Sequence, residues 1–127
     1  MDYNTRQKIV QKDLNDIYDA VANCPVVLSY EITADASAGL EIGSFPEDIA
    51  IVDIVVQCTT ANASGTVTIS DGTNDISDAI ACAVLDTIGR AGTIDATYSS
   101  ISAGDALTVT TNGALDRGLV TVLGVRV

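Results

Sequence analysis

The feature that most constrains this chain is a change of hydrophobic period at Pro25. All ten glycines and both prolines lie from Pro25 onward, whereas Thr5–Asn23 contains neither residue and repeats with a helical period. Proline lacks a backbone donor and favours an extended conformation at Cys24, so a helix must end there. We therefore expect two parts, an N-terminal amphipathic α-helix over residues 1–24 and a β domain over residues 25–127.

The N-terminal segment carries one narrow apolar seam with the alternating spacing of a heptad. Its aliphatic members are Val10, Leu14, Ile17 and Val21. Leucine at the a position with branched residues at d favours three or four strands over two. Two interpretations stay open, because the seam can pack against sister subunits or against the chain's own β domain. Since the seam is narrow, we prefer the first and predict a homotrimer.

The second part has the pattern of an all-β protein. Short runs rich in β-branched residues alternate with turn signals every eight to twelve positions. The strands are expected at Val26–Ile32, Ile49–Thr60, Thr66–Ser70, Asp75–Val84, Thr93–Ser99, Ala106–Thr111 and Leu119–Val127. Ala34–Ser44 is expected to be a loop. These seven strands are close to the eight of a jelly roll, so we expect a jelly-roll-like antiparallel β-sandwich.

In two of these strands the pattern also indicates which residues share a face. Strict alternation in Ile49–Thr60 puts one wholly apolar face toward the core, made of Val52, Ile54, Val56 and Cys58. The Asp71-Gly72 turn predicts a hairpin into Asp75–Val84, with Ile76, Asp78, Ile80, Cys82 and Val84 on one side. Ile76, Ile80 and Val84 are also spaced four residues apart, which fits a helix. We prefer a strand because the turn leads directly into it.

Composition excludes most enzyme classes. The chain has no histidine, so Ser-His and Cys-His catalytic pairs are impossible. Its only lysines are Lys8 and Lys12, and it contains no glycine-rich nucleotide-binding motif. Cys24, Cys58 and Cys82 are odd in number without metal-binding spacing, and are expected to be small buried hydrophobes. We predict no enzymatic activity, no catalytic residue and no cofactor.

Two binding functions were weighed against simpler interpretations. Asp71-Gly72-Thr73-Asn74-Asp75, with Asp78, offers oxygen ligands for calcium, but a polar hairpin tip explains the same residues, and we expect no metal site. Sugar binding favours flat aromatic faces. The β domain has no tryptophan, and its aromatic side chains are Tyr30, Phe45 and Tyr98. A carbohydrate-binding module is therefore only an alternative.

The charge distribution separates the two parts again. The net charge of −11 repels phosphate groups, so neither nucleic acid nor an anionic membrane is an expected partner. Residues 24–127 hold 13 acids and three bases, whereas residues 1–23 hold four acids and three bases, Arg6, Lys8 and Lys12. The N-terminus lacks the pattern of a secretory signal, so synthesis in the cytoplasm is expected. We expect the acidic domain to face solvent and the near-neutral segment to dock.

Three stretches resemble small structural proteins of tailed-bacteriophage heads. They are Gly65–Asn74, Ile101–Thr110 and Gly118–Val125. Capsid decoration (cement) and head-fibre proteins of this kind are β-sandwich lobes, often trimeric and sometimes preceded by a helix. The resemblance implies a structural virion protein that binds the major capsid protein on the outer capsid surface and stabilises or decorates the shell.

Within that function, Arg6, Lys8 and Lys12 are expected to meet an acidic capsid surface. A closed trimer fits the threefold positions of a capsid lattice. Two alternatives stay open at this point: a fibre or tail component that contacts a host receptor, and a cellular carbohydrate-binding or adhesion module.

Overall fold

The computed structural model describes residues 25–33, 35–60, 65–112 and 117–127. The predicted N-terminal helix over residues 1–24 lies outside these ranges. Within them, no helix is long and apolar enough to cross a membrane. The described part of the chain is all-β, as its composition predicts.

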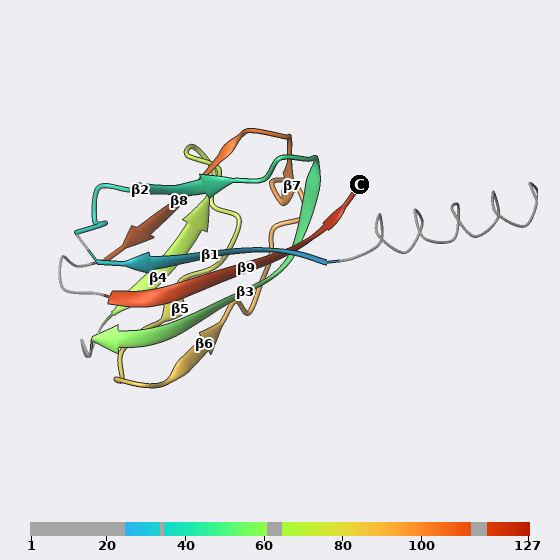
Figure 1. Cartoon of the computed structure of the whole chain (residues 1–127). Coiled ribbons are helices and arrows are strands. Elements are labelled where there is room, and N and C mark those ends of the chain that lie inside the picture. The colour runs from blue at the N-terminus through green and yellow to red at the C-terminus, as the bar shows by residue number, and fades with distance from the viewer. Residues whose placement is uncertain (1–24, 34, 61–64, 113–116) are drawn as a thin grey trace, which may run out of the picture.

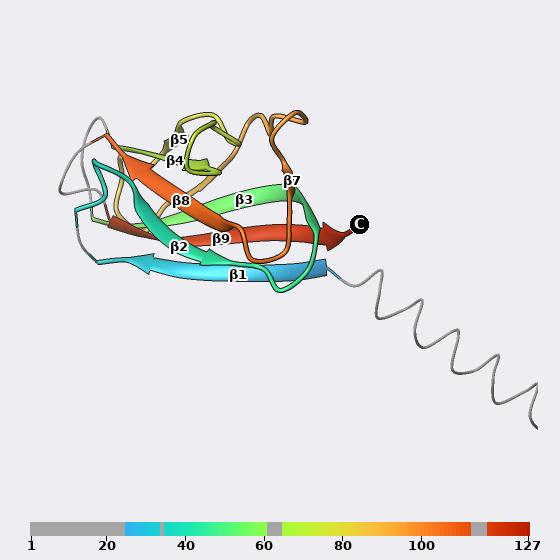
Figure 2. The ribbon, with the colours of Figure 1, turned by 90° about the horizontal axis from the view of Figure 1, so that it is seen from above.

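In the described residues, nine strands form two antiparallel sheets (Figure 1). Their bounds are β1 Pro25–Ile32, β2 Leu40–Ser44, β3 Ile49–Thr60, β4 Thr66–Ser70, β5 Ile80–Ala81, β6 Ile88–Arg90, β7 Ser100–Ile101, β8 Ala106–Thr111 and β9 Arg117–Arg126. One sheet has the order β1-β9-β3-β6, with β7 paired to β3, and the other has the order β2-β8-β4-β5. The two sheets lie face to face in the view from above (Figure 2).

The pairing of these strands is nested. The first strand pairs with the last, β2 with β8, β3 with β6, and β4 with β5. Such a pattern arises when one long antiparallel hairpin folds over itself into two sheets, which is the arrangement of a jelly roll. The chain therefore has two antiparallel sheets with jelly-roll strand order, and short β7 is an addition to it.

The core lies between the sheets and is almost entirely aliphatic. Phe45 is the one aromatic side chain that is buried among the described residues. Alternation on β8 and β9 places every second residue inward, and on β4 Val67 and Ile69 point inward. Their buried members include Val67, Ile69, Leu107, Val109, Val120 and Val122. Cys58 and Cys82 are also buried, which confirms their prediction as small buried hydrophobes.

A bulge on β3 makes one core prediction wrong. Ile51 pairs with Gly124 and Asp53 pairs with Leu123, so Val52 is an extra residue in the strand. Ile51 before the bulge is 3% exposed, Ile54 after it is fully buried, and Val52 is 54% exposed. The inward face thus changes from odd to even positions within a single strand. Strict alternation cannot anticipate that change.

The predicted strand Asp75–Val84 is reduced to β5. The Asp71-Gly72 turn is present. Of the residues predicted to share one side of the strand, Ile76, Ile80 and Cys82 are buried, whereas Asp78 and Val84 are exposed. The buried hydroxyl of Ser77 accepts a hydrogen bond from the Ile69 amide at 3.0 Å and donates one to the Asp78 carbonyl at 2.8 Å. The Ser77 side chain thereby accepts a hydrogen bond that the backbone of a neighbouring strand would otherwise accept, and the strand pairing is interrupted.

Two further boundaries differ from the prediction. Thr93–Ser99 is a loop between β6 and β7, because the Asp95 carboxylate and carbonyl accept hydrogen bonds from Thr97 and Tyr98 and form a turn. Conversely, the predicted loop Ala34–Ser44 contains β2. A register shift between Glu41 and Gly43 (φ +130°) makes this strand irregular, which hides its alternation.

Candidate interaction surfaces

The residues predicted to assemble and dock the protein belong to the N-terminal segment. The seam residues Val10, Leu14, Ile17 and Val21 and the basic residues Arg6, Lys8 and Lys12 lie outside the described ranges. Their roles stay predictions. The surfaces that the structure does describe are the two outer faces of the sandwich and a hollow beside one of them.

The outer face of the β1-β9-β3-β6 sheet is rich in exposed aliphatic side chains. We call it the apolar face; its aliphatic members are the exposed Pro25, Val27, Ile88 and Leu119 and the half-buried Val55, Leu123 and Val125. Across β1 and β9, Pro25 lies opposite Val125 and Val27 lies opposite Leu123, whereas the polar Gln57 on β3 separates Leu119 from Ile88 on β6. Val27 and Ile88 are 56% and 70% exposed. Sequence reasoning did not identify this face as a site.

Charge is scarce on the apolar face. Among the described residues, its acids are Glu31, near one end, and Asp53. Asp53 forms an ion pair with Arg90, at 3.1 Å between Oδ2 and Nε. The other described acids lie in loops or on β2. The face is therefore close to electrically neutral on a domain that is otherwise strongly acidic.

The outer face of the other sheet carries side chains with hydroxyl groups. Its outward members on β4 and β8 include Thr66, Thr68, Thr108 and Thr110, which we call the threonine face. Thr68 lies opposite Thr110, and Thr108 lies opposite both Ser70 and Glu41. Such β-branched pairs pack well across strands, and their hydroxyls are compatible with water. The two outer faces of the sandwich thus differ in chemistry.

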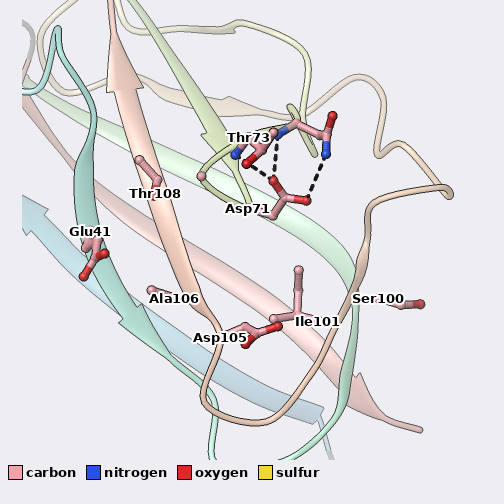
Figure 3. A pocket seen from close by; sticks show the side chains of 10 residues that line it. Glu41, Asp71, Thr73, Ser100, Ile101, Asp105, Ala106 and Thr108 are labelled. Atoms are coloured by element: carbon pink, nitrogen blue, oxygen red, sulfur yellow. Dashed lines mark hydrogen bonds between the residues drawn. The ribbon is translucent and has the colours of Figure 1, made fainter.

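An open hollow of about 440 Å³ lies beside the threonine face. Its wall includes Glu41, Asp71, Asp105 and Thr108, drawn from β2, the β4–β5 loop and the start of β8 (Figure 3). The wall holds three carboxyl groups and no basic side chain. An anionic ligand is therefore repelled from this hollow.

The carboxylate of Asp71 accepts its hydrogen bonds from its own loop. It accepts hydrogen bonds from the amides of Thr73 at 2.9 Å and Asn74 at 2.7 Å, and the Asn74 bond is the largest cause of a lowered Asp71 pKa. Asp78, another of the acids that could offer oxygen ligands to calcium, instead accepts a hydrogen bond from the Gly92 amide at 3.0 Å. Within the described ranges, no group of three potential ligands is placed to hold a metal ion.

Replacing Asp71 by Ala is expected to lower the free energy of unfolding by about 1 kcal/mol at pH 7, because two loop amides lose their acceptor. The folded pKa lies below the unfolded one, so the carboxylate stabilises the fold above the ordinary value of 3.8. This contribution is lost as the pH falls through the lowered value. Urea unfolding of wild type and variant between pH 2 and pH 7 measures the difference.

The matched control is Asp75→Ala, an exposed acid on the same hairpin, which should change stability by less than about 0.5 kcal/mol. A difference between wild type and Asp71→Ala that stays constant over the whole pH range would contradict the stabilising role of the carboxylate.

The aromatic side chains considered for sugar binding are not gathered on one surface. Phe45 is buried in the core, and Tyr30 and Tyr98 are partly buried and pack against it. The structure therefore offers no flat aromatic platform from these three residues.

Comparison with known proteins gives a likeness of fold. No protein-family model matches the chain, and no curated protein sequence matches it. A chain in the capsid of Ralstonia phage GP4 has a similar fold, with a TM-score of 0.61 and 12% identity over 84% of this chain and 86% of that chain. A chain of the cyanophage Pam1 capsid asymmetric unit matches with a TM-score of 0.49 and 11% identity, over 81% and 84% of the two chains. This protein thus shares its fold with a phage capsid chain.

Proposed function

We propose that this protein is a structural component of a phage virion, a trimeric decoration or cement protein on the outer surface of the capsid. The observation that carries the proposal is the likeness to the chain in the Ralstonia phage GP4 capsid, which spans most of both chains. At 12% identity the likeness concerns the fold. The chemistry of the surfaces must therefore support the function independently.

Two properties of the described surface support a structural role. A protein on the outside of a shell needs one surface suited to water and another that contacts neighbours. The threonine face and the acidic loops are suited to water, and the apolar face is suited to contact. The net charge of −11 also disfavours aggregation at the high local density of a capsid lattice.

The N-terminal segment supplies the proposed attachment. In this account Arg6, Lys8 and Lys12 meet acidic groups of the major capsid protein, and the seam from Val10 to Val21 joins three copies. A trimer matches a threefold lattice position by symmetry. Three weak contacts made together give tight attachment without a large interface in each copy.

The test is binding to shells. Expanded shells are assembled from the major capsid protein of the same genome without this protein, incubated with the purified chain and sedimented. Saturable co-sedimentation at three copies per threefold position is expected. Replacing Arg6, Lys8 and Lys12 by Glu reverses their charge and should weaken binding to the shells at least about tenfold.

Shells of an unrelated phage serve as the control and should leave the protein in the supernatant. If the protein stays in the supernatant with its own shells at every concentration, the proposed function is wrong.

A further inference from the structure

The apolar face has the extent of a protein contact. The four strands have 8, 10, 12 and 3 residues. At about 3.4 Å per residue and about 4.8 Å between strands, they span roughly 500 Å² in projection. Side chains raise the accessible area above the projected one, so the face approaches the roughly 800 Å² that each partner contributes to a standard interface. Aliphatic residues gathered on one sheet face of this extent, with little charge among them, suit a binding surface.

Charge indicates which partner the face can accept. Two copies of a chain with a net charge of −11 repel each other unless they meet where acids are scarce. The apolar face is such a place, since Asp53 is paired with Arg90 and Glu31 is the other described acid on it. Its polar members, such as Ser29, Gln57 and Thr121, are uncharged. Among the described residues, the centre of the face therefore carries the Asp53–Arg90 ion pair, and Glu31 lies toward one end.

A free strand edge borders the same face. Within the described ranges, β1 pairs on one side with β9, and no strand pairs with its other side. β1 is eight residues long and its register with β9 is regular, whereas β5 and β6 have two and three residues and β2 has a register shift. Long regular edges are open to pairing with other chains and are usually covered. A neighbouring copy seated on the apolar face can cover this edge.

We propose that the β domains of neighbouring copies pack against each other through the apolar face, so that the trimer is held by its β domains as well as by its N-terminal seam. The inference rests on the trimer of the proposed function and names a second contact within it. It places the threonine face and its acidic hollow away from the contact, toward solvent.

The test compares the assembly of two full-length double variants. Val27→Glu with Ile88→Glu adds two charges at highly exposed positions on the outer strands of the face. Ala38→Glu with Ala79→Glu adds the same charge at exposed loop positions outside it. Sedimentation velocity across a concentration series measures the dissociation constant of the trimer. The first variant should raise it roughly hundredfold, and the control should leave it within about twofold.

Folding is checked separately by thermal unfolding, since both positions are exposed and the variant should retain a cooperative transition. If it does not, Val27→Ala with Ile88→Ala is used instead and should raise the dissociation constant roughly tenfold. A second arm removes the seam by Leu14→Asp with Ile17→Asp. This variant should still associate at high concentration, and adding Val27→Glu with Ile88→Glu should abolish that association.

The inference is overturned if the face variants assemble as the wild type does. It is also overturned if the wild type remains a monomer at every concentration tested. These outcomes are distinct from failure of the proposed function: a monomer that still binds shells refutes the contact alone, and a trimer that binds no shell refutes the function alone.

Discussion

Truncating Ile51 to Ala is expected to lower the free energy of unfolding by about 2–5 kcal/mol, whereas Val52→Ala should change it by less than about 1 kcal/mol. Ile51 is 3% exposed and Val52 is 54% exposed. Strict alternation with Ile54 would instead place Val52 in the core. The difference arises from the bulge, which adds Val52 to β3 without a partner on β9.

Urea unfolding of the two variants in the same buffer measures this difference in the free energy of unfolding. Ile54→Ala provides a second buried reference after the bulge and should resemble Ile51→Ala, since Ile54 is fully buried. If Val52→Ala costs more than Ile51→Ala, the bulge is absent from the folded protein and the strand alternates regularly.

A methyl group at Gly124 should have the next largest effect. Its β-carbon would overlap Cγ2 of Ile49 and lie 3.2 Å from the carbonyl oxygen of Ala50. Ile49 is fully buried, so it has little room to move aside. We expect Gly124→Ala to lower the free energy of unfolding by about 3 kcal/mol, because overpacking a tight core forces strained side chains or a backbone shift.

The matched control is Gly104→Asn. Gly104 has a positive φ of 82° and no heavy atom within 4 Å of a β-carbon, and asparagine tolerates this backbone region. A loss below about 1 kcal/mol is expected there. Calorimetric melting of both variants measures the contrast. Equal melting temperatures for Gly124→Ala and wild type would show that β9 does not lie as close to β3 as described.

The strands with clean alternation were predictable from the sequence. β4 and β8 begin and end at the predicted residues, because alternating threonine and aliphatic residues specify both the strand and its inward face. The bulge at Val52 depends on which β9 residues lie opposite, and Ser77 interrupts the predicted strand through bonds to Ile69 and Asp78. Both features arise from contacts between strands rather than from local pattern.

The apolar face was only partly predictable. β9 carries aliphatic residues on both of its faces, such as Leu123 outward and Val122 inward, and a strand that is apolar on both faces indicates a second covered surface. Neighbouring strands decide whether the outward residues form a continuous patch, and Ile88 joins it through a three-residue strand that was not predicted. The seam from Val10 to Val21 stays a prediction.

Imaging of decorated shells tests the central claim most directly. Electron cryomicroscopy is applied to shells of the same genome's major capsid protein before and after incubation with the purified chain. The account predicts three β-sandwich lobes around each threefold position of the outer surface, with their apolar faces toward one another and their threonine faces toward solvent. Shells that show the same bare surface before and after incubation would contradict it.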